Sequence, residues 1–260
     1  GTGGSGAKLF NVSTAAAFVT AAAGAHVAKH GNRKMTSASG SADVLEAAGV
    51  NLALIPTQIG QCIRDVGVGF LFAQAHHGAM KHAAPVRQEL GVRTLMNLLG
   101  PLTNPAGARR QVIGVFSPQF QQIVAEVLRL LGAEHVLVVH ANGLDEITLD
   151  GPSFVVELKG GDITSYEIAP EDFGIERGPV EALRADSPAA SLALVLEALE
   201  KPDSPAADIV SLNAGAAIYA AGVATSLVNG VAMAQDAIAA GLARERLDEL
   251  VRISSLMGET

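Results

Sequence analysis

The stretch GTGGSGAKLFNVSTAAAFVTAAAG, residues 1–24, places a glycine-rich segment directly before an alanine-rich run. Residues 14–23 have helical spacing, and Gly24 is a natural end for that helix. The apolar run HVAKHG at 26–31 follows at once and is typical of a short buried strand. A loop, a helix and a strand in this order form the unit from which α/β folds are built.

The same alternation continues through the first half of the chain. Short apolar runs predict further strands at 67–73, 111–116 and 135–141. Helical spacing or helix-start residues predict helices at 42–49, 56–65 and 118–131. We therefore predict an α/β fold with a mostly parallel central sheet flanked by helices.

The pattern changes in the second half. The segment SFVVELKGGDITSYEI at 153–168 predicts a hairpin at the edge of the sheet, with a turn over 160–162. Helical periodicity then runs from 188 to 256, and the Pro-, Gly- and Asp-containing stretch 170–188 is the nearest feature to a linker. We expect a single α/β domain over 1–260, closed by C-terminal helices.

Composition and charge limit the kinds of partner. The formal net charge is −8, and a negative surface repels a polyphosphate backbone, so we expect no nucleic-acid partner. No uninterrupted apolar run approaches the roughly 18 to 20 residues that span a bilayer, so we expect no membrane partner. Cys62 is the single cysteine and cannot pair within the chain; with no signal-like start, this favours a cytoplasmic protein.

The glycine-rich loop is a candidate anion site. Glycines allow the backbone to approach a ligand, and a helix that begins near Ser13 would direct its free N–H groups and positive dipole end at that ligand. A tight strand-to-helix connection has the same composition, so the loop alone does not decide the matter.

A basic, hydroxyl-rich segment, KHGNRKMTSASGSAD at 29–43, follows the first predicted strand. It offers positive charge at Lys29 and Arg33, together with several serine and threonine hydroxyls. Multiply charged phosphates require such donors. A solvated basic loop is the alternative.

Two adjacent carboxylates, Asp145 and Glu146, stand just after the strand predicted at 135–141. Carboxylates at a strand end can hold a hard divalent cation, usually Mg²⁺, which keeps several waters and bridges to substrate phosphates. A solvated acidic turn is the alternative for this pair taken alone. A magnesium-bound polyphosphate, however, needs the anion loop, the basic segment and the acidic pair together.

These stretches carry a family resemblance. The segments GTGGSG, FNVSTAAAF, KHGNR, SGSADVLEA, PVRQELGVRT, NLLGPLTNPAGA and GLDEIT are similar to those of the anthranilate phosphoribosyltransferase family, which has a nucleoside-phosphorylase-II-like fold. The likeness is specific to about residue 150 and looser beyond it. It implies an enzyme of tryptophan biosynthesis that binds 5-phosphoribosyl 1-diphosphate with Mg²⁺. The amine of anthranilate then displaces diphosphate at the anomeric carbon.

The resemblance also implies roles for matching positions. Contacts to 5-phosphoribosyl 1-diphosphate would come from Gly1, Gly4, Ser5, Leu9, Asn11, Ser13, Thr14, Lys29, His30, Gly31, Asn32, Arg33, Ser37 and Ser41. Lys29, Asn32 and Arg87 would act in catalysis, with Asn32 reaching anthranilate and Arg87 facing its carboxylate. Magnesium would be held by Ser13, Asp145 and Glu146.

Some of these positions have other readings from the residues alone. Arg87 is equally consistent with a charge on a helix surface. His30, His76 and His77 could contact substrate or accept a late proton, but a structural role suits them as well.

The resemblance places a hinge or helical segment at 80–105, which would pack on the N-terminal helical domain that precedes the glycine loop in the family and that we expect to be absent here. It also implies a homodimer. Two positions depart from the family pattern, since aspartate is usual where Ser5 stands and threonine or serine where Leu9 stands. We expect these departures and the missing segment to weaken activity.

Two other functions remain open from the sequence. A pyrimidine-nucleoside phosphorylase would use a similar glycine loop, although KHGN and the acidic pair fit the anthranilate enzyme better. A ligand-binding or regulatory relative could have lost catalysis through Ser5 and Leu9. It would, however, have less reason to retain Lys29, Asn32, Arg87 and Glu146.

Overall fold

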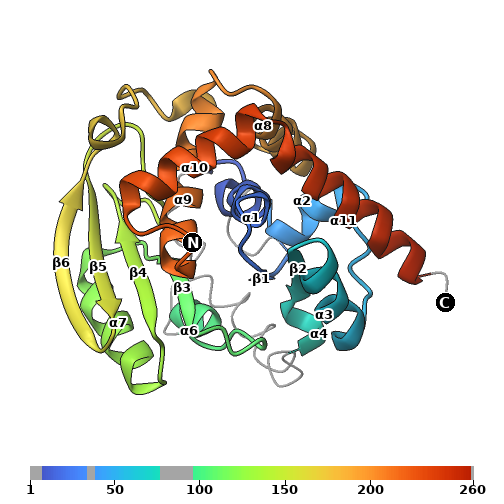
Figure 1. Cartoon of the computed structure of the whole chain (residues 1–260), viewed down its shortest axis with the longest axis horizontal. Coiled ribbons are helices and arrows are strands. Elements are labelled where there is room, and N and C mark those ends of the chain that lie inside the picture. Colours follow the sequence, from blue (N-terminus) through green and yellow to red (C-terminus); the bar gives the residue numbers. More distant parts are fainter. Residues whose placement is uncertain (1–7, 34–38, 77–95, 259–260) are drawn as a thin grey trace.

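A computed structural model describes residues 8–33, 39–76 and 96–258 of the chain. Helix α1 (Val12–Ala22) lies at the centre of the view in Figure 1, with a four-stranded sheet on one side and a small two-stranded sheet with its helices on the other. Nine of its eleven residues are buried. Alanine predominates in this helix, and its small side chains let neighbouring elements pack closely around it.

The smaller sheet is formed by two parallel strands, β1 (Val27–Gly31) and β2 (Val68–Phe72). The chain passes between them through α2 (Ser41–Ala47) and α3 (Pro56–Asp65), and β2 leads directly into α4 (Ala73–His76). Pro56 occupies the first turn of α3, where its missing N–H is not needed. A crossover with helices is the connection that parallel strands require.

The larger sheet has the strand order β3-β4-β5-β6. Its strands and the helices before and between them are β3 (Arg110–Gly114), β4 (His135–His140), β5 (Ser153–Lys159), β6 (Asp162–Ile168), α6 (Met96–Leu102), the 3-10 turn η1 (Pro118–Phe120) and α7 (Gln121–Leu130). Strands β3 and β4 are parallel and are joined through α7, whereas β4, β5 and β6 pair antiparallel. Gly160 and Gly161 turn the hairpin with φ of +61° and +97°.

Strand β4 is buried on both faces, which explains its continuous apolar sequence. Leu137 and Val139 belong to the main core, which also contains residues of α1. Val136 and Val138 belong to a second core that includes residues of α7. The acidic pair that follows β4 is therefore attached to one of the best-buried strands of the protein.

The C-terminal part is helical, as the sequence predicts. Its elements are the 3-10 turns η2 (Pro170–Phe173) and η3 (Glu181–Leu183) and the helices α8 (Pro188–Glu200), α9 (Pro205–Ala221), α10 (Leu227–Ala239) and α11 (Leu242–Gly258). Ser187, Ser204 and Ser226 each cap a helix by accepting a hydrogen bond from the backbone N–H three residues on. Helix α9 packs against α1, α10 and strands β3 and β4, so it joins the helical part to the larger sheet.

The predicted α/β class, the parallel pairs and the edge hairpin are confirmed. The arrangement of the strands differs from the prediction, because the described strands form two sheets instead of one central sheet. Parallel pairing is limited to β1/β2 and β3/β4. The physical reason is that the connection from β4 to β5 contains no crossover helix, and antiparallel pairing is what a short connection allows.

Several predicted features fall outside the described residues. They are the glycine loop up to residue 7, Ser37, His77, Arg87 and most of the segment 80–105, of which α6 and the residues after it are described. Among the described helices, none has both the length and the apolar character needed to span a membrane.

Candidate active site

The start of α1 is tied to two distant parts of the chain through Asn11. This residue is the N-cap of α1, yet its side chain makes no capping hydrogen bond to the helix. Its Nδ2 instead donates to Ser39 Oγ at 3.1 Å and to Ser191 Oγ at 3.1 Å, and its backbone N–H also donates to Ser191 Oγ at 2.9 Å. Ser191 lies on α8 and is fully buried. These contacts hold the start of α1 against α8 and against the segment before α2.

Lys29 brings the second site segment to the same helix end. Its Nζ donates to Ser13 Oγ at 3.1 Å, which joins strand β1 to the first turn of α1. Burial lowers the pKa of Lys29, and the negative charge of Glu146 acts in the opposite direction. Burial likewise raises the pKa of Glu146, with Asp145 adding to this effect and Lys29 opposing it. Lys29 therefore contacts Ser13 and interacts electrostatically with Glu146.

The acidic pair lies in a segment with a fixed backbone. Ala141 and Leu144 form a backbone bridge around a turn in which Asn142 and Gly143 have φ of +44° and +84°. Immediately after the turn, the backbone carbonyl of Asp145 packs on Gly114, where a Cβ atom would overlap it. Only glycine leaves room for this approach.

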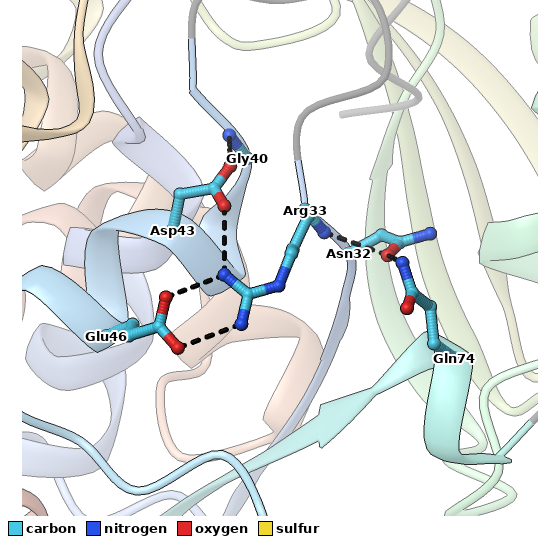
Figure 2. A network of polar contacts seen from close by, with 6 residues as sticks. All are labelled: Asn32, Arg33, Gly40, Asp43, Glu46 and Gln74. Atoms are coloured by element: carbon cyan, nitrogen blue, oxygen red, sulfur yellow. Dashed lines mark hydrogen bonds and ion pairs between the residues drawn. The ribbon is translucent and has the colours of Figure 1, made fainter. Parts of the chain in front are cut away.

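The basic segment makes a network of polar contacts at the start of α2 (Figure 2). The guanidinium of Arg33 forms a two-point contact with Glu46, with Nη1–Oε2 at 2.6 Å and Nη2–Oε1 at 2.8 Å, and lies 3.3 Å from Asp43. Asp43 in turn accepts a hydrogen bond from the backbone N–H of Gly40 at 2.9 Å. These carboxylates raise the pKa of the Arg33 guanidinium. Its charge is thus partly neutralised by α2.

Asn32 lies on the other side of Arg33 in the same view (Figure 2). Its Oδ1 accepts hydrogen bonds from the backbone N–H of Arg33 at 2.8 Å and from Gln74 Nε2 at 3.3 Å. The amide group of Asn32 is therefore held in one orientation between β1 and α4.

The other predicted site residues in the described ranges lie close to these segments. His30 and Gly31 end strand β1, and Gly31 packs so closely on Ser41 that a Cβ atom would overlap the serine hydroxyl. The hydroxyl of Thr14 is buried and has no hydrogen-bond partner among the described residues. Leu9 pairs with Arg184 through the backbone and packs against the main core.

The donor set suits a hard divalent cation. Asp145 and Glu146 provide carboxylates and Ser13 a hydroxyl, and oxygen ligands of this kind are those that Mg²⁺ prefers. Because Gly114 packs closely on the backbone carbonyl of Asp145, the main chain that carries the two carboxylates is held in place. In the part of the chain that the structure describes, no three His, Cys, Asp or Glu side chains are grouped so as to hold a metal ion by themselves.

Sequence reasoning missed three residues that build this site: Gly114, Ser191 and Asn213. Asn213 lies on α9, and its side chain makes hydrogen bonds with the backbone of Ile147, next to the acidic pair. Ser191 and Asn213 are polar residues in otherwise apolar helices, and a buried polar side chain needs a hydrogen-bond partner. That signal indicates a contact, but the sequence gives no indication of where the partner lies.

Comparison with protein families identifies the class. A family model described as "Glycosyl transferase family, a/b domain" matches residues 1–244, and the chain belongs to this family. Within it, the chain is a member of the anthranilate phosphoribosyltransferases, as the sequence resemblance implies. The curated anthranilate phosphoribosyltransferase of Ectopseudomonas mendocina is 58% identical over 261 residues, which cover 98% of this chain and 75% of the relative.

Solved structures agree with this assignment. The anthranilate phosphoribosyltransferase of Thermus thermophilus superposes with a TM-score of 0.92 at 50% identity, covering 98% of this chain and 76% of that one. The Saccharomyces cerevisiae enzyme in complex with PRPP and Mg has a TM-score of 0.88 at 27% identity, covering 98% and 72%.

Proposed function

We propose that this protein transfers the phosphoribosyl group of 5-phosphoribosyl 1-diphosphate to the amine of anthranilate. The products are N-(5-phosphoribosyl)anthranilate and diphosphate, and the reaction depends on Mg²⁺. The observation that carries the proposal is the contact of Lys29 with Ser13 at the start of α1. The negative charge of Glu146 acts on the same lysine. A relative that is 58% identical is named for this activity, as an anthranilate phosphoribosyltransferase.

The charges of the site suit the departure of diphosphate. When the bond at the anomeric carbon breaks, negative charge develops on the leaving group and positive charge on the sugar. The ammonium of Lys29 and the N–H groups at the start of α1 would stabilise the negative charge. Bound Mg²⁺, held by Ser13, Asp145 and Glu146, would neutralise phosphate oxygens. The partial desolvation of Lys29 strengthens its interaction with an anion.

The acceptor needs positioning more than activation. The neutral amine of anthranilate already has a usable lone pair, so no strong general base is required at the outset. Asn32, held by Gln74 and the backbone, would contact the amine side. Arg87 would bind the carboxylate in a two-point contact.

Replacement of Arg87 by alanine should then raise KM for anthranilate far more than KM for 5-phosphoribosyl 1-diphosphate.

A direct assay tests the proposed function. The protein is incubated with anthranilate, 5-phosphoribosyl 1-diphosphate and Mg²⁺, and the loss of anthranilate fluorescence is followed. A parallel incubation with uridine or thymidine and phosphate tests nucleoside phosphorolysis. No loss of anthranilate at high protein concentration, with ligand binding intact, would favour the regulatory relative over the enzyme.

The variant Lys29→Met tests the observation on which the proposal rests. It keeps most of the apolar stem and removes the charge, so kcat/KM should fall roughly ten- to a hundredfold, as expected for loss of a charged hydrogen bond worth about 1.5–3 kcal/mol. Lys159→Met is the matched control, since Lys159 is exposed on β5 and donates to Tyr219. Similar losses in the two variants would contradict the role of Lys29.

Further features belong to the same proposal. The protein would act as a homodimer in the cytoplasm, with 80–105 as its hinge segment, and size-exclusion chromatography with light scattering measures the dimer. The remaining substrate contacts would be those that the resemblance implies.

Ser5 and Leu9 would reduce activity. The double variant Ser5→Asp, Leu9→Thr should therefore have a higher activity than the wild type.

A further inference from the structure

We propose that Asn213 is a positioning residue for the metal-binding acidic pair, an inference that rests on the proposed function. Asn213 lies on α9, sixty-six positions beyond the residue it contacts, and only 4% of it is exposed. It would touch neither substrate nor metal. It would act by fixing the backbone from which the carboxylate of Glu146 projects.

The side-chain amide of Asn213 binds both the backbone N–H and the backbone carbonyl of Ile147. Oδ1 of Asn213 accepts a hydrogen bond from the backbone N–H of Ile147 at 3.0 Å, and Nδ2 donates to the carbonyl of Ile147 at 2.9 Å. A primary amide is the smallest side-chain group that can satisfy a donor and an acceptor of one residue in this way. Ile147 directly follows Glu146, so this clamp holds the backbone on one side of the carboxylate.

The amide of Asn213 is itself held in place. Its Nδ2 also donates to the carbonyl of Ile209, one turn earlier on α9, at 2.8 Å. All hydrogen-bonding atoms of the side chain therefore have a defined orientation, and a flipped amide would lose all three contacts. Helix α9 is rigidly placed in turn, because it packs against α1 and against strands β3 and β4.

A second constraint acts on the other side of Glu146. The carbonyl of Asp145 rests on Gly114, at the end of β3. The backbone of the pair is thus fixed before and after Glu146 by two elements that meet on the larger sheet. Groups that orient metal ligands in this manner change metal affinity or activity by about 10- to 100-fold when removed.

The proposal is tested by the magnesium dependence of substrate binding, which is independent of turnover. 5-Phosphoribosyl 1-diphosphate is titrated calorimetrically into the full chain, once with Mg²⁺ and once with EDTA. In the wild type, Mg²⁺ should tighten binding. In Asn213→Ala, this enhancement should fall about 10- to 100-fold, while the affinity in EDTA changes little.

Gln121→Ala is the matched control. Gln121, at the start of α7, is also a buried amide, and its Nε2 donates to the carbonyls of Val138 and Phe154 in the larger sheet at 2.8 and 2.7 Å. Its loss should lower stability by a comparable amount and leave the magnesium enhancement unchanged. Equal loss of the enhancement in both variants would mean that Asn213 acts only through general stability.

Asn213→Thr serves if the alanine variant does not fold. Threonine can keep the bond to the Ile209 carbonyl within the helix but cannot span both groups of Ile147. The same loss of enhancement is expected. A folded variant that keeps the wild-type enhancement within twofold overturns the proposal, as does failure of both variants to fold. A wild type that binds without any effect of Mg²⁺ and shows no turnover would instead overturn the proposed function.

Discussion

Gly114 illustrates how a single residue without functional groups determines the position of functional ones. The carbonyl of Asp145 occupies the space where a side chain would lie. No side chain at position 114 can be accommodated unless the acidic turn moves away from β3. The residue therefore matters for the shape of the candidate metal site more than for the sheet in which it lies.

Gly114→Ala should displace the acidic turn. Overpacking of this kind typically costs about 1–3 kcal/mol, so the free energy of unfolding should fall by that amount and the half-saturating Mg²⁺ concentration should rise. Urea unfolding and a Mg²⁺ titration of activity measure the two effects. Gly151→Ala is the control, because a Cβ there meets no atom within 4 Å. A folded, fully active Gly114→Ala with unchanged Mg²⁺ dependence would contradict the packing argument.

Site residues differed in how far the sequence could place them. Lys29, Ser13 and Glu146 stand beside recognisable loops and strand ends, and the contact of Lys29 with Ser13 fits the polyphosphate site expected from their chemistry. Ser191 and Asn213 contact segments that are 180 and 66 positions away along the chain. Local composition carries no information on contacts of that range.

At the scale of elements, a buried polar network joins three strands and a helix away from the candidate site. Glu157 on β5 accepts hydrogen bonds from Tyr166 of β6 at 2.7 Å and Tyr219 of α9 at 2.8 Å, and His135 Nε2 of β4 lies 2.8 Å from the same carboxylate. Burial opposes ionisation of Glu157, but these hydrogen bonds hold its pKa below the ordinary value. Burial also lowers the pKa of His135, although Glu157 opposes this effect.

The network predicts loss of stability in acid. The unfolded state binds a proton at histidine near pH 6.5, above the pKa of folded His135, so the free energy of unfolding falls as the pH drops below about 6.5. Glu157 acts in the same direction below about pH 4.3. His135→Gln should flatten the dependence between pH 7 and 5 by up to about 1.4 kcal/mol per pH unit. Urea unfolding at a series of pH values measures how the free energy of unfolding depends on pH.

Helices α9 and α10 cross at two glycines. A Cβ on Gly230 would overlap the carbonyl of Gly215, and a Cβ on Gly215 would lie 2.5 Å from a methyl carbon of Val231. The close approach requires small residues on both helices. Helix α9 is thereby held between α10 and the larger sheet.

Two opposing effects decide the outcome of Gly230→Ala. Alanine gains about 1 kcal/mol in helix propensity, whereas overpacking at the crossing costs about 1–3 kcal/mol. We expect net destabilisation, measured as a lower Tm. Gly60→Ala in α3 is the control, because its Cβ would meet only Arg64 at an ordinary 3.5 Å, and its Tm should rise. A higher Tm for Gly230→Ala would show that the helices can move apart.

Local signals predicted most elements well, and long-range pairing poorly. The helix at 56–65 is found with the predicted bounds, because Pro56 marks its first turn and its apolar face is clear. The hairpin is found because two glycines mark its turn. The division into two sheets was not predictable from strand composition, since β4 is apolar throughout and such a strand suits parallel and antiparallel neighbours alike.

At the scale of the whole molecule, the candidate site joins segments that belong to both sheets. Lys29 comes from the smaller sheet, the acidic pair follows β4 of the larger one, and Ser13 comes from the helix between them (Figure 1). A ligand that contacts all three would oppose separation of the two halves. Ligand binding should therefore stabilise the entire fold.

Saturation with 5-phosphoribosyl 1-diphosphate and Mg²⁺ should raise Tm. At a ligand concentration of 100 times Kd, the stabilisation is about 2.7 kcal/mol. This corresponds to roughly 5–10 °C for a domain of this size. Differential scanning calorimetry measures the shift, and replacement of Mg²⁺ by EDTA should reduce it. An unchanged Tm at saturating ligand would contradict a site shared between the sheets.

The clustering of Tyr166 and Tyr219 on Glu157 has an optical consequence. They are the two tyrosines of the chain, which has no tryptophan. A phenol that donates to a carboxylate emits weakly, because the excited hydroxyl passes its proton to the acceptor. Intrinsic ultraviolet emission of the native protein should therefore be dim and should brighten when the junction of α9 with the larger sheet opens. The two tyrosines would therefore report the unfolding of this junction without an added label, and no tryptophan emission would overlap theirs.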